Sequence, residues 1–235
     1  MADISYTPSI ERLAQSFRTL PGVGKKSAYR MAFADVEKYM ETAEKLKQKY
    51  KEYIDIITGF EMEYYPKDFE KMYKTALEIG TQYLILGEHF TMDESDESSF
   101  YSFSSTDNEE KLKNYVSTVA EGIKTGVFTY VAHPDIIKFV GDEDVYINEM
   151  SKICEASLKY NIPLEINFLG IREKRLYPRD SFWQIAGELK CPVTFGFDCH
   201  SARSAYDDRS LEKAEELVKK HNLNYIGKPD IIFIK

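Results

Sequence analysis

Three of the four histidines in this sequence stand where a short apolar run ends. These are His89, His133 and His200, and each follows a run of the length and composition of a buried strand. The carboxyl ends of parallel strands meet at one edge of a sheet, where α/β proteins place their active sites. Imidazole nitrogens are natural ligands of zinc, manganese and iron. The positions of the histidines therefore favour a site for a divalent metal ion.

Two carboxylates extend this set of side chains. Glu61 follows the first strand-like run, and Asp198 stands two residues before His200, so that both should point to the same side of an extended segment. A single histidine at a strand end is more often a hydrogen-bonded structural residue, and only the joint occurrence favours ligation. A bridging carboxylate with such a pair predicts two or more metal ions. The predicted ligands are Glu61, His89, His133, Asp198 and His200.

These side chains need a scaffold, and the sequence alternates between strand and helix patterns from residue 53 onward. The predicted strands are residues 53–58, 83–86, 127–132, 164–168, 193–197 and 231–234. The predicted helices are residues 68–79, 109–123, 144–160, 180–189 and 210–221. Alternation of this kind indicates an α/β fold with a parallel sheet or a barrel.

Composition bounds the class of protein. The chain has 235 residues, of which 43% are hydrophobic, enough for a sizeable core in one large domain. No apolar run reaches the ~18 residues that a membrane-spanning helix needs, and the first residues lack the pattern of a signal peptide. Three cysteines without a C-x-x-C pair indicate a reducing compartment. We therefore expect a cytoplasmic protein that does not enter membranes.

Charge divides the chain unevenly. Residues 1–34 carry five basic and two acidic side chains and so have a net charge of +3. The whole chain has a net charge of −8, so the other 201 residues together carry −11. Because phosphate contacts need a basic face, the acidic part argues against nucleic acid binding by the whole protein. The two parts are expected to have different partners.

Residues 33–235 resemble the polymerase-and-histidinol-phosphatase (PHP) superfamily, in particular its histidinol-phosphate phosphatases. The resemblance rests on the strings GFEMEYYP, GEHF, VAHPD, PLEINFLGIR and FGFDCHS, in this order and spacing. It implies a distorted seven-stranded α/β barrel that holds up to three divalent ions of zinc, manganese or iron. It also implies hydrolysis of a small phosphorylated substrate, histidinol phosphate, in histidine biosynthesis.

The resemblance also implies roles for individual residues. Glu61 would bridge two metals, the other four predicted ligands would each bind one, and Asp198 and His200 would act in catalysis. Arg172 is a candidate phosphate clamp, and Asn167 would line the same pocket. A solvated loop cation is the alternative interpretation of Arg172.

The sequence departs from the PHP pattern at its beginning. Members open with a strand bearing His-x-His, and a second strand ends in Ser-Asp-His, but the first histidine here is His89. We therefore expect an incomplete barrel without its first two strands, an open sheet of five or six strands. Either the N-terminal helices or a homo-oligomer would cover the open edges. Fewer metals and weak or absent phosphatase activity should follow.

Residues 9–33 resemble instead the helix-hairpin-helix that opens the recombination mediator RecR. In such a hairpin Gly22 and Gly24 allow the backbone to approach a DNA phosphate closely, and Lys25 and Lys26 add attraction that does not depend on sequence. An ordinary helix-turn-helix corner is the structural alternative. The predicted organisation is a helix-hairpin-helix segment over residues 1–34 and a truncated PHP domain over 35–235. A DNA-associated protein with weak DNA contact is the alternative function.

Overall fold

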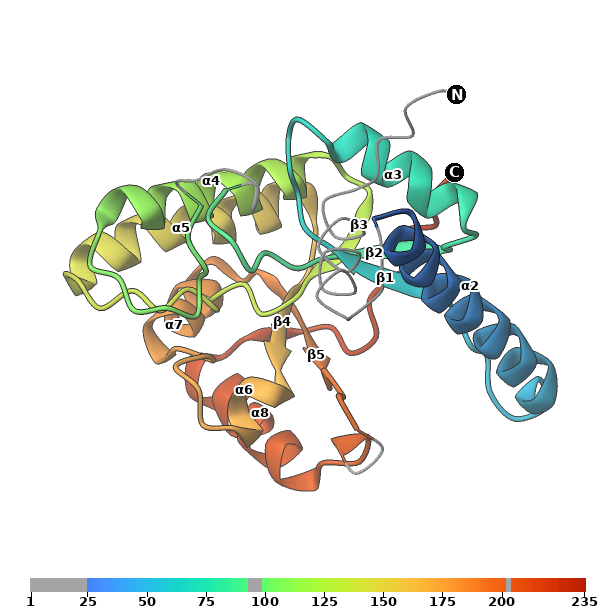
Figure 1. Cartoon of the computed structure of the whole chain (residues 1–235). Coiled ribbons are helices and arrows are strands. Elements are labelled where there is room, and N and C mark those ends of the chain that lie inside the picture. Colours follow the sequence, from blue (N-terminus) through green and yellow to red (C-terminus); the bar gives the residue numbers. More distant parts are fainter. Residues whose placement is uncertain (1–24, 93–98, 202–203) are drawn as a thin grey trace. The chain divides into compact units, whose positions relative to one another are not determined.

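Figure 1 shows a computed structural model of the chain. It describes residues 25–92, 99–201 and 204–235, and side chains of the first helix from Val36 on, except that of Glu37. The chain divides into two compact units. The described part of the first comprises residues 25–60, 66–82 and 234–235, and the second comprises residues 61–65 and 83–233. The predicted helix before the hairpin lies outside the described residues.

The first unit is built around helix α2, Lys25–Tyr50, which the sequence predicts because no proline or glycine interrupts it. The ring of Tyr39 lies 5.5 Å from that of Phe60. Near the other end, Lys47 Nζ donates to Thr58 Oγ1 and to Gln82 Oε1, both at 2.6 Å. Helix α3, Phe69–Glu78, completes this unit and agrees with the predicted segment 68–79.

The strand predicted at residues 53–58 is wrong. The first strand, β1, is Gly59–Met62, so Glu61 lies within the strand instead of following it. Its Met62 carbonyl accepts a hydrogen bond from the backbone N–H of Gly87. Tyr53 and Ile54 are exposed instead. The β-branched run has strand propensity, but strand formation depends on a pairing partner that local propensity does not reveal.

The sheet has six strands in the order β1-β2-β3-β4-β5-β6. The other strands are β2 Tyr83–Leu86, β3 Phe128–Val131, β4 Leu164–Asn167, β5 Pro192–Gly196 and β6 Asn224–Tyr225. From β2 to β6 each pairs with its neighbour in parallel. The predicted parallel α/β sheet is confirmed, and the incomplete barrel stays a prediction.

The last predicted strand is also misplaced. Residues 231–234 form only one antiparallel bridge, between Phe233 and Tyr83, and the sixth strand is the short β6. A further helix, α6 Phe168–Arg172, begins where strand 164–168 was expected to end. Asn167 starts it, because its side-chain oxygen accepts the backbone N–H of Gly170 and caps the helix. The apolar pattern alone does not show this change from strand to helix.

The remaining helices agree with the sequence pattern to within a few residues. They are α4 Glu109–Lys124, α5 Glu143–Tyr160, α7 Asp180–Leu189 and α8 Asp208–His221. Helices α4 and α5 pack side by side (Figure 1), and α7 packs on α5. Trp183, Tyr115 and Tyr146 are among the largest buried side chains of the core between these helices and the sheet. Among the described helices, none combines the length and apolarity needed to cross a membrane.

Candidate metal centre

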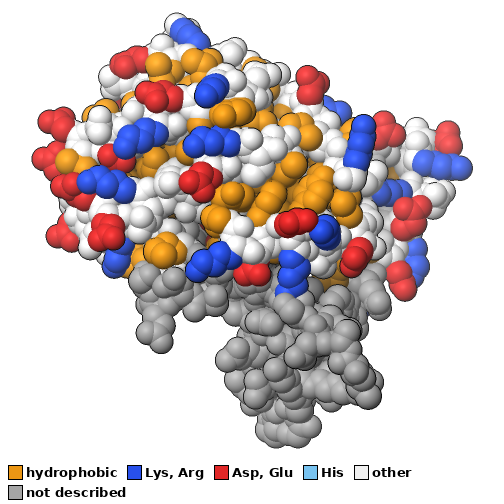
Figure 2. All heavy atoms as spheres, turned by 90° about the horizontal axis from the view of Figure 1, so that it is seen from above, with side chains coloured by type: hydrophobic (Ala, Val, Ile, Leu, Met, Phe, Trp, Pro, Cys, Tyr) orange, Lys and Arg blue, Asp and Glu red, His pale blue; other side chains and the backbone are white. Residues whose placement is uncertain are grey.

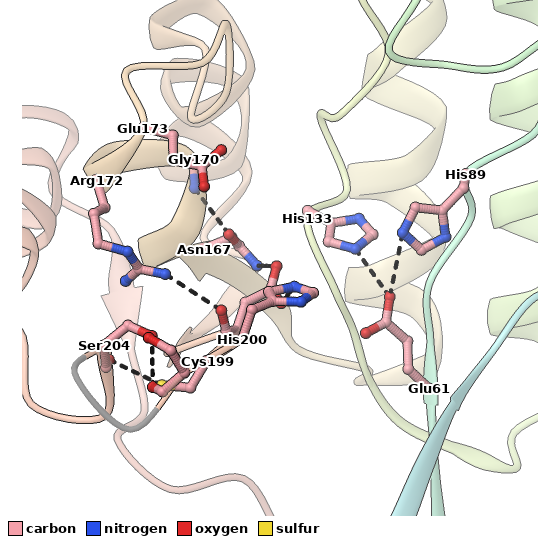
Figure 3. A network of polar contacts seen from close by, with 12 residues as sticks. Glu61, His89, His133, Asn167, Gly170, Arg172, Glu173, Cys199, His200 and Ser204 are labelled. Carbon is pink, nitrogen blue, oxygen red and sulfur yellow. Dashed lines mark hydrogen bonds and ion pairs between the residues drawn. The ribbon is translucent and has the colours of Figure 1, made fainter. Parts of the chain in front are cut away.

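The structure brings three of the five predicted ligands together at one edge of the sheet. Glu61 comes from β1, His89 follows β2 and His133 follows β3, so three adjacent strands each supply one side chain. One ligand atom of each lies within 4.8 Å of the others. Figure 3 shows both imidazoles turned toward the Glu61 carboxylate.

The distances suit a metal ion. Glu61 Oε1 is 3.0 Å from His133 Nε2 and 3.7 Å from His89 Nε2. Ligands at ~2.1 Å from a tetrahedral ion lie about 3.4 Å from one another, between these two values. Two histidines and one carboxylate are also the donor set of catalytic zinc sites, which keep a further position open. The residues present therefore fit a divalent cation.

The charges of the three groups are coupled. Burial alone would raise the pKa of Glu61, but the hydrogen bond and charge of His133, with the charges of His89 and His200, hold this pKa below its ordinary value. Burial would lower the pKa of His133, yet the hydrogen bond to Glu61 and the surrounding carboxylates raise it overall. Glu61 is thus held as a carboxylate, the form that binds cations.

The backbone of His133 has a conformation that few residues adopt. Its φ of 32° lies in the left-handed region, and its side chain is buried. Its backbone N–H donates to Glu165 Oε2 at 2.9 Å, while Nδ1 has no hydrogen-bond partner among the described residues. Residues held in such conformations gather at functional sites, because the surrounding structure must impose them.

Sequence reasoning missed a carboxylate that contacts His89. Glu63 Oε1 lies 3.4 Å from His89 Nδ1, and Glu63 Oε2 accepts the hydroxyl hydrogen of Tyr65 at 2.7 Å. A carboxylate beside the second nitrogen of a ligating imidazole fixes the orientation of the ring. The sequence could have indicated this contact, because Glu63 stands two residues after Glu61 and residues two apart in an extended segment share a face.

Gly87 was missed as well. A Cβ at this position would collide with the carboxyl group of Glu61. The glycine stands directly after β2, so it lets the Glu61 side chain cross to His89 and His133. The Gly-Glu-His string could have pointed to this role, because the sequence around its glycine does not predict a turn.

Asp198 and His200 form a second group beside the three predicted ligands that the structure brings together. The prediction of an extended segment is wrong, because Asp198 has a φ of 43° in the left-handed region. His200 Nε2 lies 2.9 Å from Asp198 Oδ1, so the two side chains face each other. Asp198 Oδ2 accepts from the amide of Asn167 at 3.2 Å. The His200 side chain remains 75% exposed.

Arg172 and Asn167 lie on the same side of the sheet as this second group. The Arg172 guanidinium donates to Asp207 Oδ2 at 3.0 Å and to the Asp198 carbonyl at 3.3 Å. It also lines a cavity of about 320 Å³. The cavity lining is Leu169, Arg172, Glu173, His200, Ser201, Ser204, Tyr206 and Asp207. The amide of Asn167 contacts Asp198, Glu165 and the backbone N–H of Gly170.

The structure does not describe the side chains that the alternative DNA-binding prediction names. Gly22 and Gly24 lie outside the described residues, and Lys25 and Lys26 begin α2 with side chains that also lie outside them. On the face drawn in Figure 2, the described basic and acidic side chains are interspersed. That face therefore does not offer DNA a continuous basic surface.

Comparison with solved structures finds a fold likeness to the crystal structure of histidinol phosphate phosphatase from Lactococcus lactis subsp. lactis Il1403, which is complexed with zinc, L-histidinol and phosphate. The TM-score is 0.59 at 18% sequence identity, over 84% of this chain and 79% of that one. The family model of the RecR helix-hairpin-helix matches residues 10–52, a range that runs through the whole of α2. A search of curated proteins gave no match. Both likenesses agree with the resemblances seen in the sequence.

Proposed function

We propose that this chain is a metal-dependent phosphomonoester hydrolase of the PHP type. The single observation that carries the proposal is the convergence of Glu61, His89 and His133 at one edge of the sheet. It is supported by the likeness in fold to a phosphatase whose crystal structure holds zinc and phosphate. Three side chains separated by up to 72 residues do not meet in this way through local sequence alone.

Each side chain has a definite task in this proposal. When bound, a divalent cation supplies Lewis acidity to a phosphoryl oxygen and favours ionisation of water. Glu61 supplies the negative charge that holds the cation, and the two histidines orient it through neutral nitrogens. Asp198 and His200 would hold a second cation or receive the proton that the attacking water loses.

The cavity that Arg172 and His200 line supports the proposed substrate class. Arg172 lines this cavity with His200, and a guanidinium matches the geometry of a phosphate group. Part of its hydrogen-bonding capacity is already engaged by Asp207 and Asp198. We propose histidinol phosphate as the substrate, following the named function of the similar phosphatase, and a role for this chain in histidine biosynthesis.

We expect weak activity compared with a complete PHP enzyme. The sequence lacks the His-x-His and Ser-Asp-His strings, so three ligands of the PHP pattern are missing. Because metal ions stabilise charge that develops in the transition state, losing one should cost several kcal/mol of that stabilisation. The chain should therefore hold fewer than three ions.

Metal content and turnover of the purified full chain test the proposal together. We expect at least one zinc or manganese ion per chain and slow release of phosphate from histidinol phosphate. Glu61→Gln should abolish both, whereas Glu109→Gln, which changes an exposed carboxylate on α4, should change neither. Wild-type protein that binds no more metal than the Glu61→Gln variant would contradict the proposal.

The RecR-type match favours a second, weaker candidate, association with DNA. It predicts binding to duplex DNA that weakens steeply with salt, because lysine–phosphate contacts release counterions. Replacing Gly22, Gly24 and Lys25 should abolish this binding, while Glu61→Gln should leave it unchanged. Equal binding by wild type and the hairpin variant would exclude it. The net charge of −8 weighs against high affinity.

A further inference from the structure

Glu165 is a buried carboxylate outside the predicted ligand set, and it lies between the two groups of the candidate site. It stands in β4, with only 3% of its surface exposed. Its Oε2 accepts two hydrogen bonds, from the backbone N–H of His133 at 2.9 Å and from Asn167 Nδ2 at 3.0 Å. One buried oxygen therefore connects the end of β3 with the end of β4.

Asn167 continues this connection to β5. Its Nδ2 donates to Asp198 Oδ2 at 3.2 Å as well as to Glu165. Its Oδ1 accepts the backbone N–H of Gly170 at 3.1 Å and caps α6. Because the cap uses the amide oxygen, the amide nitrogen faces the carboxylates of Glu165 and Asp198.

The Glu165 carboxyl group occupies space that a side chain at Gly196 would fill. Gly196 of β5 pairs in register with Asn167, and a Cβ at Gly196 would overlap the Glu165 carboxyl group. The glycine therefore permits the carboxylate to lie between the strands. A larger residue there would push Glu165 away from His133.

His133 and Asp198 need such support because both adopt left-handed backbone conformations, with φ of 32° and 43°. Neither is a glycine, so neither conformation is preferred locally, and surrounding contacts must impose it. Glu165 accepts the backbone N–H of His133, and Asn167 donates to the side chain of Asp198.

We propose that Glu165 and Asn167 are a pair of positioning residues, which hold His133 and Asp198 in the arrangement that metal binding requires. This inference rests on the proposed metal-dependent function. Neither residue needs to touch the ion, since each acts through a side chain or backbone group of another. Groups that orient metal ligands in this way commonly change metal affinity 10- to 100-fold when they are removed.

Co²⁺ titration of the full chain tests the proposal without relying on activity, because cobalt absorption reports coordination geometry. Glu165→Leu removes the oxygen that accepts both hydrogen bonds, so we expect a 10- to 100-fold weaker Kd for Co²⁺ and an altered absorption spectrum. Glu165→Gln retains an oxygen that can accept both hydrogen bonds, so it should keep the wild-type spectrum and an affinity within about 3-fold.

Asn167→Asp provides a second variant that should fold. It retains the oxygen that caps α6 but replaces the bridging donor with a third carboxylate beside Glu165 and Asp198. We expect the same direction of change as in Glu165→Leu, again by at least 10-fold in the Kd for Co²⁺.

Thr194→Val is the matched control. It removes a partly buried hydrogen bond on the neighbouring strand β5, from Thr194 Oγ1 to the Gly227 carbonyl at 2.8 Å. It should lower the melting temperature but leave the cobalt spectrum and Kd unchanged. If it weakens cobalt binding as much as Asn167→Asp, general loosening of the sheet explains the result and the proposal fails.

Two results distinguish this inference from the proposed function. Folded Glu165→Leu and Asn167→Asp variants with wild-type cobalt spectra and affinities would overturn the positioning pair alone. Wild-type protein that binds no Co²⁺, Zn²⁺ or Mn²⁺ would overturn the proposed function and the pair with it.

Discussion

Glu61 is the residue on which the candidate centre depends, because one of its oxygens faces both imidazoles. Its lowered pKa follows from those neighbours, which outweigh the effect of burial. The sequence predicts Glu61 as a metal ligand but does not show which side chains surround it. Its neighbours His89 and His133 follow the next two strands along the sheet, and they help to hold the pKa of Glu61 below its ordinary value.

Gly87→Ala should weaken metal binding with little loss of stability. The added Cβ would meet the far end of the flexible Glu61 side chain. This side chain can change rotamer, and its carboxylate would then lose contact with the two histidines. We expect zinc affinity to fall by about 10-fold or more, as measured by competition with a chelating dye.

Gly126→Ala is the control for this substitution. Gly126 has a φ of +68° with open space around it, so an added Cβ should cost about 1 kcal/mol of unfolding free energy and leave zinc binding unchanged. A Gly87→Ala variant with wild-type zinc affinity would show that the space beside Glu61 is not needed for binding.

At the scale of elements, helix α7 is anchored to the segment that carries His133. Asp135, two residues after His133, accepts hydrogen bonds from the backbone N–H of Arg179 at 2.5 Å and from Trp183 Nε1 at 3.1 Å. Burial raises the pKa of Asp135 to about 6, although these donors and the charge of His133 act in the opposite direction. The helix is thus hydrogen-bonded to a residue two positions after the candidate ligand His133.

Trp183→Phe should reduce the free energy of unfolding by about 1–3 kcal/mol, since the Asp135 carboxylate loses a buried donor. Chemical denaturation followed by circular dichroism would measure the change. Tyr146→Phe is the matched control in the same core, because the Tyr146 hydroxyl has no hydrogen-bond partner among the described residues. Its removal should be neutral or stabilising, and equal losses in both variants would contradict the role of the Trp183–Asp135 contact.

At the scale of the whole molecule, a metal site that exists only in the folded state should stabilise the folded chain. A cation at 100 times its Kd adds about 2.7 kcal/mol to the free energy of unfolding, which corresponds to a rise in Tm of about 5–10 °C for a chain of this length. Scanning calorimetry with zinc or manganese, and with EDTA, would measure this rise. Glu61→Gln should lose it, and a wild-type Tm that is the same with metal and with EDTA would argue against a native-state site.

The sequence predicts the helices of the second unit well because their signals are local. Apolar residues recur at helical spacing, and polar caps such as Asn108 and Asp142 mark where α4 and α5 begin. The predicted positions of the first and last strands, β1 and β6, are wrong because a strand forms only where it pairs with another strand. Residues 53–58 have strand propensity and remain outside the sheet, whereas β1 pairs with β2.

The site shows the same division. The sequence shows the types of the candidate ligands, because histidines and carboxylates near strand ends are visible in it. The role of Glu165 could not be predicted, because nothing near it in the sequence marks an acidic residue inside a buried strand as functional. Its role depends on a hydrogen bond from the backbone N–H of His133, 32 residues earlier. The left-handed backbone of Asp198 could not be predicted either, because no local pattern marks it and its side chain contacts Asn167, 31 residues earlier.

The sequence by itself determined an alternating α/β chain with imidazole and carboxylate groups where strands end, because periodicity and residue type act over a few neighbouring positions. The tertiary structure alone decided that Glu61, His89 and His133 meet within 4.8 Å and that Glu165 and Asn167 connect them to Asp198. These distances depend on the order and register of strands, which arise from contacts between distant residues.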